Sequence, residues 1–211
     1  MRSVLLLGVT LAIGACSTIA QPTRMTAQST LDWRAVASET DRERLRDWRK
    51  TFVGALGAAR RAGHGAEIAR EAALLEPDAA LGGGAIPNGE YRCRVIKLGA
   101  KSEGMLDYVS YPPFTCRIRA EGRLQHFTKL TGSQRQVGLI FPGDAVRPVF
   151  LGTLALGDEP AALQYGQDET RNVAGFVERI GPNRWRLVMP RPHFESQLDV
   201  VELVPLRSGV R

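Results

Sequence analysis

Apolar and polar residues follow two different rhythms on either side of residue 88. Before it, Leu45, Trp48, Phe52, Leu56 and Ala59 recur every three or four positions, which is the spacing of one face of an α-helix. After it, short segments alternate apolar and polar residues and are separated by Gly, Pro, Asn and Asp, which is typical of antiparallel strands. The chain is therefore expected to adopt an α+β fold in which helices precede a sheet.

The helical segment, residues 31–76, is expected to form a hairpin. Thr40, followed by Glu43, has the form of a capping box and predicts a helix start, and Gly63 suits the end of that helix. A second, shorter helix is expected over residues 65–75. The apolar stripe is narrow and short helices are marginal in water, so the hairpin should pack on the outside of the sheet or across one end of it.

Residues 77–88 are rich in Gly and Pro and predict a linker. Residues 89–205 predict an antiparallel meander of about eight strands, closed as a barrel or, alternatively, stacked as a sandwich. Residues 173–180 also fit a helical stripe, but Gly175 and the turn after them favour a strand. The expected strands cover residues 90–98, 114–120, 123–130, 135–141, 146–156, 162–165, 173–180, 184–189 and 198–204.

Cys93 and Cys116 each lie on the apolar side of an expected strand, with arginines on the opposite side. Apart from Cys16 these are the only cysteines of the chain. In an oxidising compartment outside the cytoplasm, which the first residues of the chain indicate (next paragraph), they are expected to form a disulfide, which should stabilise the fold by about 3 kcal/mol. Two buried free thiols are the alternative. The inner face of the sheet is expected to include Tyr91, Val95, Ile118, Trp185 and Leu187.

Residues 1–15 have the form of a secretory signal peptide. Their apolar run, residues 4–13, is shorter than the roughly 20 residues that a transmembrane helix needs. Small residues precede Cys16, and the segment resembles the lipobox of bacterial lipoproteins; an ordinary signal peptide with a chance cysteine is the alternative. The resemblance implies that Cys16 is lipidated. The residues that follow are polar and lack periodicity, so residues 16–30 predict a lipidated tether. In such lipoproteins a residue other than aspartate after the cysteine, here Ser17, implies anchoring at the periplasmic face of the outer membrane.

Charge adds little to this picture. The formal net charge of +6 falls to +5 when residues 1–15, which carry one arginine and no acid, are removed. An excess of this size can attract anionic lipid or glycan, whereas nucleic acid is not expected as a partner of an exported protein. On two expected strands Arg92, Arg94, Arg117 and Arg119 form a basic stripe, which is an exposed outer face or, alternatively, an anion site.

No catalytic or metal-binding motif stands out in the sequence. His64, His126 and His193 lie near no cysteine or carboxylate at the spacing of metal ligands, and there is no Gly-x-Ser-x-Gly motif. We therefore expect neither a cofactor nor a metal, and a non-enzymatic role is favoured over catalysis.

The candidate binding site lies at the mouth of the expected barrel. The connection over residues 99–113 is longer than an ordinary hairpin loop, and long loops in compact domains are often functional. It contains Tyr108 and Tyr111, whose rings can contact both apolar and polar groups. Lys97, Lys129 and Arg135 near strand ends would supply positive charge. The alternative is that this loop merely closes the barrel and that the aromatic residues belong to its core.

Two resemblances accompany these patterns. Residues 90–99, 127–135, 150–154 and 184–187 together resemble an uncharacterised family of bacterial envelope lipoproteins, defined by a domain of unknown function, over about residues 31–205. Gly89-Glu90-Tyr91 is similar to the Gly-x-Trp that starts the first strand of calycins, with tyrosine in place of tryptophan, which implies a calycin-like barrel. Small periplasmic peptidase inhibitors of that barrel type also carry one disulfide near their first strands.

The sequence thus favours a cell-envelope lipoprotein whose barrel binds a ligand or a protein without catalysis. The alternative is a periplasmic inhibitor of a peptidase or a glycan hydrolase. A cavity lined by aromatic residues would indicate a small amphipathic ligand. A filled barrel with a protruding loop over residues 101–113 would indicate an envelope protein as the partner.

Overall fold

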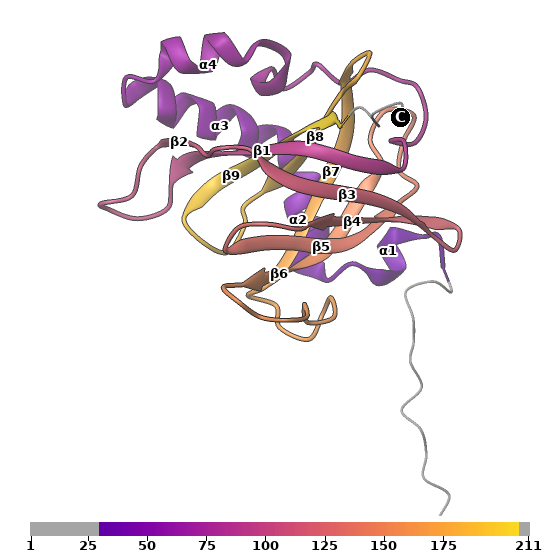
Figure 1. Cartoon of the computed structure of the whole chain (residues 1–211). Coiled ribbons are helices and arrows are strands. Elements are labelled where there is room, and N and C mark those ends of the chain that lie inside the picture. The colour runs from indigo at the N-terminus through magenta and orange to yellow at the C-terminus, as the bar shows by residue number, and fades with distance from the viewer. Residues whose placement is uncertain (1–29, 207–211) are drawn as a thin grey trace, which may run out of the picture.

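The alternating segments after residue 88 form nine antiparallel strands in the computed structural model, which describes residues 30–206 (Figure 1). Each strand pairs with the next one in the chain from β3 to β9, and β1 pairs with both β3 and β9, so eight strands close a barrel. The short β2 pairs with the far end of β1 outside this ring. The strands are β1 (Gly89–Ala100), β2 (Tyr108–Ser110), β3 (Phe114–Glu121), β4 (Leu124–Lys129), β5 (Gln134–Phe141), β6 (Val149–Leu156), β7 (Asn172–Gly181), β8 (Arg184–Pro190) and β9 (Ser196–Pro205). The predicted α+β fold with a meander barrel is confirmed.

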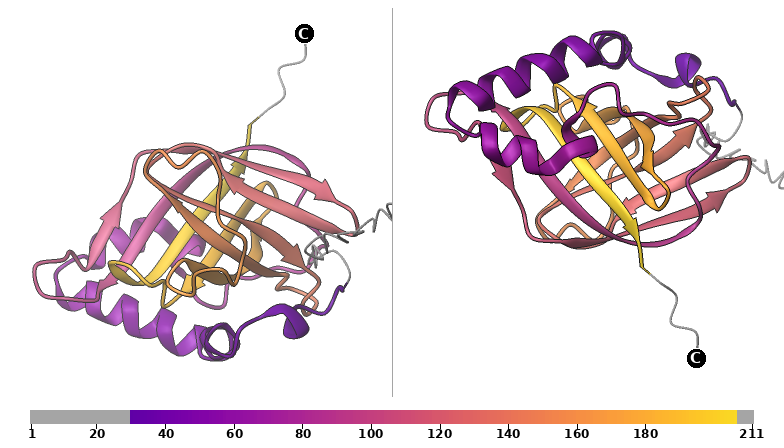
Figure 2. Two further views of the ribbon diagram at one scale, coloured as in Figure 1. Left: turned by 90° about the horizontal axis from the view of Figure 1, so that it is seen from below. Right: turned by 90° about the horizontal axis from the view of Figure 1, so that it is seen from above.

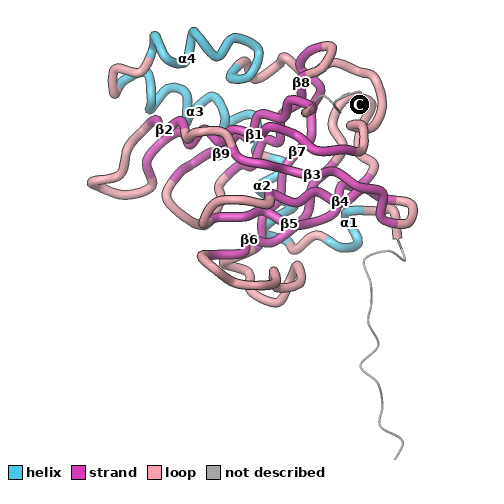
Figure 3. The backbone as a smooth tube through the Cα atoms, in the orientation of Figure 1, coloured by secondary structure: helices cyan, strands magenta, loops and turns pink. Residues whose placement is uncertain are grey.

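The connections between strands lie at two opposite ends of the barrel (Figure 3). We call one the loop end; it carries residues 101–107, 130–133, 157–171 and 191–195. We call the other the linker end; it carries the turns at 122–123 and 182–183, the loop 142–148 and the linker 77–88.

Side chains that alternate along the strands fill the barrel. The five residues expected on the inner face, Tyr91, Val95, Ile118, Trp185 and Leu187, are all buried in one hydrophobic cluster. Phe127 and Phe150 meet edge to face inside it, with ring centroids 5.6 Å apart. Their bulk requires Gly152, because a Cβ at that position would lie 2.5 Å from Cζ of Phe150. The core is therefore packed with side chains rather than hollow.

The helical segment covers the outside of β1 and of β7 to β9 (Figure 2). It is divided into α1 (Trp33–Val36), α2 (Glu39–Arg46), α3 (Trp48–Arg61), α4 (Gly65–Glu71) and the 3₁₀ turn η2 (Ala72–Leu75). Phe52 and Leu56 of α3 belong to a second cluster formed by outward-facing residues such as Ile96, Val188 and Val200. The expected packing of the helical stripe on the outside of the sheet is confirmed. Leu45 is the exception, since it joins a third cluster with residues of β5, β6 and β7.

A buried arginine joins these helices to the barrel. Arg186 of β8 is fully buried, and its Nε donates to the Glu178 carboxylate at 2.7 Å. The rest of its guanidinium donates to four backbone carbonyls where η2 ends and the linker begins, those of Ala73, Leu74, Glu76 and Pro77, at 2.8–3.1 Å. These carbonyls lack partners within the helix, so a donor has to come from elsewhere. One side chain therefore satisfies the buried end of the helical segment.

The predicted disulfide between Cys93 and Cys116 is present, with the Cα atoms 5.8 Å apart. Three of the four arginines on the opposite faces of the same two strands are paired with carboxylates, and Arg92 is exposed. Arg94 contacts Glu71 of α4 and Glu202 of β9, while Arg117 and Arg119 each contact a neighbouring glutamate. The basic stripe is thus largely neutralised on the outer face of the barrel.

Two local predictions were wrong, and one strand was missed. Residues 162–165 form no strand; they belong to the loop after β6, where the Tyr165 hydroxyl donates to the buried Asp41 at 2.5 Å instead of the backbone joining the sheet. The first long helix starts two residues earlier than the capping box at Thr40 indicates, because the Ser38 hydroxyl accepts from the Asp41 backbone N–H. The strand at Tyr108–Ser110 was missed, since three residues are too short to show alternation.

Replacing Arg186 with alanine should lower the free energy of unfolding by about 3–5 kcal/mol, because the buried Glu178 would keep only Arg147 as a partner and four backbone carbonyls would lose their donor. Urea unfolding measures this change. Arg117→Ala is the matched control: it removes a half-exposed pair with Glu90 and should cost less than about 1 kcal/mol. Equal losses in the two variants would show that the Arg186 contacts do not hold the helices in place.

Candidate functional site

Charged side chains occupy the inside of the barrel at the loop end. The inward positions of β1 carry Tyr91, Cys93 and Val95 and then Lys97, which is 6% exposed. Lys97 is paired across the strands with Asp199 of β9, which is 3% exposed. Buried charges are costly unless they are paired and hydrogen-bonded, so this end of the barrel differs chemically from the apolar centre.

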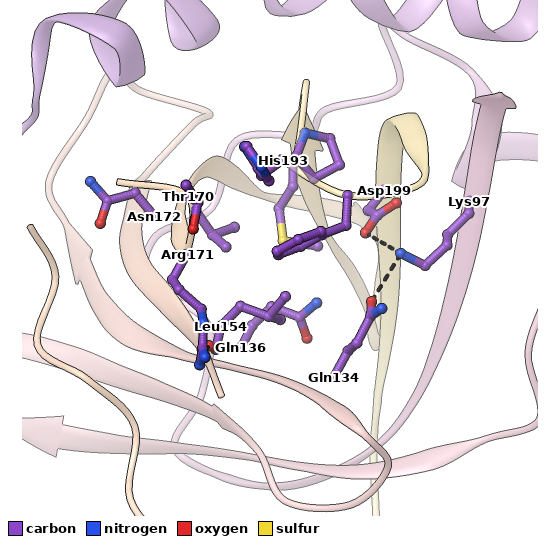
Figure 4. A pocket seen from close by; sticks show the side chains of 13 residues that line it. Lys97, Gln134, Gln136, Leu154, Thr170, Arg171, Asn172, His193 and Asp199 are labelled. Atoms are coloured by element: carbon purple, nitrogen blue, oxygen red, sulfur yellow. Dashed lines mark hydrogen bonds and ion pairs between the residues drawn. The ribbon is translucent and has the colours of Figure 1, made fainter. Parts of the chain in front are cut away.

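Three acceptors surround the Lys97 ammonium, and two of them, Asp199 and Gln134, are drawn in Figure 4. Its Nζ lies 3.1 Å from Asp199 Oδ2, 3.1 Å from Glu195 Oε2 and 3.1 Å from Gln134 Oε1. Burial opposes its charge, but the two carboxylates outweigh burial and raise the pKa of Lys97 above its ordinary value. Burial raises the pKa of Asp199 as well, although Lys97 and the Ser196 hydroxyl counteract it. Lys97 therefore stays protonated at neutral pH and holds three segments together.

Lys129 of β4 lies at the same end and has no carboxylate partner among the described residues. Its Nζ donates to the carbonyls of Thr131 and Gln134, both at 2.8 Å, and stands 3.7 Å from the centre of the Phe114 ring. Burial, together with the positive charges of Arg135 and Lys97, lowers the pKa of Lys129 to about 8. Gln134 connects the two lysines, because its side chain accepts from Lys97 and its backbone from Lys129.

A small cavity lies beside Lys97 and is covered by the β8–β9 loop, residues 191–195. Its volume is about 10 Å³, room for one water molecule. Gln136 points into this region, and its Oε1 is buried without a hydrogen-bond partner in the described part of the chain (Figure 4). Arg191 and Glu195, at the two ends of the covering loop, have φ values of 48° and 64°, in the left-handed region that non-glycine residues adopt at a cost. The ion pair of Glu195 with Lys97 helps to hold this conformation.

The structure brings together only part of the predicted binding site. Tyr108 lies against the helices, where its hydroxyl donates to Glu71 at 3.3 Å and its ring stacks on His64. The Arg135 guanidinium binds three backbone carbonyls of the neighbouring loops, those of Gly132, Gly157 and Glu159. Tyr111 is half-buried against the barrel core. These three side chains are engaged in holding loops and helices, whereas Lys97 and Lys129 share the interior of the loop end.

Sequence reasoning missed Gln134, Gln136, Glu195 and Asp199. Asp199 could have been found from the sequence. It is an acid in a mainly apolar strand, and alternation places it on the same inward face as Val201 and Leu203. Glu195 carried no such signal, because it reaches Lys97 only through the conformation of the loop. Within residues 30–206 no three His, Cys, Asp or Glu side chains gather as a metal site.

The depressed pKa of Lys129 predicts how stability depends on pH. The unfolded chain holds this proton up to its ordinary pKa of 10.5, whereas the folded protein releases it near 8. Unfolding therefore takes up a proton between these values, and Lys129 should make the protein more stable by about 1–3 kcal/mol as the pH rises from about 7.5 to 9.5. Urea unfolding of wild type and Lys129→Met at both pH values tests this. The advantage of the methionine variant should shrink as the pH rises, and a constant difference would contradict the assignment.

Comparison with known proteins agrees with the resemblance to a domain of unknown function and adds neither a cellular location nor an activity. No curated protein matches the chain. The model of the domain of unknown function DUF4893 matches residues 33–203, which span the helices and nearly the whole barrel. This chain, with its helix-covered eight-stranded barrel, therefore belongs to the DUF4893 family.

Proposed function

We propose that this chain is an envelope lipoprotein whose barrel binds a partner protein at the loop end without catalysing a reaction. The observation that carries the proposal is the β1–β2 loop, residues 101–107. Leu106 in this loop is 67% exposed, more than any other large apolar side chain in the described residues, and the adjacent Met105 is 43% exposed. Neighbouring exposed apolar side chains on a projecting loop are typical of protein contact sites.

The filled barrel supports a protein partner over a small ligand at this end. Ligand pockets usually enclose about 300 Å³ or more, whereas the cavity inside the barrel at the loop end holds about 10 Å³. A larger hollow at this end, of about 630 Å³, lies outside the barrel between the helices and residues such as Lys101 and Arg191. Recognition at this end would therefore use the outer surface of the loops rather than the barrel interior.

The base of the loop is held in a fixed geometry, which lowers the entropy lost on binding. The Asp107 carboxylate accepts a hydrogen bond from the Ala100 backbone N–H at 2.9 Å. The Asp107 backbone carbonyl accepts one from the Gly99 backbone N–H, also at 2.9 Å. The Lys101 backbone N–H donates to the Glu195 carbonyl at 3.0 Å. The alternative function, inhibition of a peptidase or a glycan hydrolase, would use the same feature, since a rigid projecting loop can enter an enzyme cleft.

The lipid anchor at Cys16 lies outside the described residues. Over residues 30–206 no helix is long and apolar enough to cross a membrane. Leu31 and Trp33, near the start of the described chain, pack in one cluster with Leu124 and Phe141 near the linker end. Anchoring through Cys16 at the periplasmic face of the outer membrane would therefore leave the loop end free to meet a partner in the periplasm.

Cys16→Ser should move the protein from the membrane to the soluble periplasmic fraction, because the cysteine is the site of acylation. Fractionation followed by detection of the chain measures the change. Ser17→Ala is the matched control and should stay with the membrane. If the cysteine variant stayed membrane-bound as well, the lipoprotein assignment would be wrong.

A photo-crosslinking residue at position 106 should capture an envelope protein in intact cells. The same residue at Val53, which is 46% exposed on α3, serves as the control and should not capture that protein. Mass spectrometry then separates the two functions: a peptidase or a glycan hydrolase supports the inhibitor, and any other envelope protein supports the binding module. If both positions captured the same proteins, the loop over residues 101–107 would not be the binding surface.

A further inference from the structure

A second hollow opens at the linker end and has no counterpart in the predicted site. Its volume is about 320 Å³, and it lies between linker residues 81–86, residues 123–125 and the loop after β5. This volume falls within the range of small-molecule sites. The cavity inside the barrel at the loop end is far smaller, so the two ends of the barrel interior differ in what they can admit.

The floor of the hollow is the barrel core itself. Ile86, Ile140, Val177 and Trp185 line it, are 2–6% exposed and belong to the central hydrophobic cluster. Leu81, which is 45% exposed, stands among the linker residues that form one wall. An apolar group that enters the hollow from solvent would therefore contact apolar side chains along the linker wall and on the floor.

The polar groups around the hollow are mainly donors. Arg123 is exposed and has no acidic partner among the described residues. Arg179 uses Nε and Nη2 to donate to the Gly82 carbonyl, which leaves Nη1 without a partner in that part of the chain. Trp185, which also lines the hollow, adds an indole N–H that donates to no group within residues 30–206. Asp144, the one acid lining the hollow, already accepts from two backbone N–H groups of its own loop.

The linker wall has a defined conformation. Leu81 forms an isolated bridge with Arg179, and its backbone N–H donates to the Arg179 carbonyl at 2.7 Å. Gly83 has a φ of 135°, and a Cβ there would lie 2.9 Å from Cζ of Arg179. The glycines therefore let the linker close against Arg179 and form one side of the hollow.

We propose that the linker end binds a single-chain anionic amphiphile of the fatty-acid type. The alkyl chain would occupy the apolar hollow, and the carboxylate would lie between Arg123 and Arg179 at the rim. Apolar walls with a net positive rim fit this chemistry better than they fit a neutral or a cationic ligand. In addition, the described chain begins near the linker end, so anchoring through Cys16 would hold the linker end near a membrane. Only this last argument rests on the proposed function.

Calorimetric titration of decanoate into the full-length Cys16→Ser chain tests the proposal, and it does so independently of lipid anchoring. Decanoate should bind at one site, and 1-decanol should bind about two- to fivefold more weakly because it lacks the charge. Arg123→Gln should weaken decanoate binding by about the same factor and leave decanol unchanged. Arg61→Gln, an exposed arginine on α3, is the charge-matched control and should change neither.

Ala145→Trp tests the apolar part of the site. Ala145 is exposed and lines the hollow, so a tryptophan there should fill the space without disturbing the core, and binding of both ligands should fall about tenfold or more. Absence of decanoate binding to the parent chain below the micellar range would overturn the proposal. Binding that neither Ala145→Trp nor Arg123→Gln weakens would also overturn it, since the ligand would then sit elsewhere.

Discussion

The buried contact between Arg186 and Glu178 is the interaction on which the arrangement of this protein depends. Taking both charges out of water is unfavourable, and a well-packed apolar pair is often as stable as a buried ion pair. The guanidinium is nevertheless suited to this position, because its fixed fork of donors meets one carboxylate and four carbonyls at once. Arg147 adds a second contact to Glu178 at 2.7 Å and lies over the ring of Trp48, which extends the same network to the start of α3.

This contact also determines where the linker runs. The carbonyls that Arg186 binds end at Pro77, so the chain leaves the helices at a fixed point beside β8. From there the linker crosses the end of the barrel. It is held by Arg179 at Gly82, by Gln125 at the Ile86 carbonyl and by the Tyr91 hydroxyl at the Pro87 carbonyl. Ile86 then enters the barrel core. One end of the barrel is thereby closed by a segment that has no regular structure of its own.

The two ends of the barrel are chemically opposite as a result. At the loop end the interior is polar, and Lys97 and Lys129 are satisfied by carboxylates, amides and carbonyls from several strands and loops. At the linker end the interior remains apolar up to the hollow beneath the linker. Membership in the DUF4893 family supplies no activity to choose between these ends, so the chemistry of each end is the basis for what it is proposed to bind.

The sequence by itself determined that helices precede an antiparallel meander, the inner face of the barrel and the disulfide, because alternation and helical spacing are local properties of the chain. It indicated that Cys93 and Cys116 share an interior, and it placed Lys97 and Lys129 near strand ends. It did not distinguish Arg186 from Arg184, since both alternate with apolar residues and both are expected on the outer face of the strand. Only the tertiary structure decided that Arg186 lies under η2 and that Glu195 reaches Lys97. Those contacts join residues that are far apart in the chain. They depend on backbone carbonyls and on a loop conformation, which a pattern of residue types does not predict.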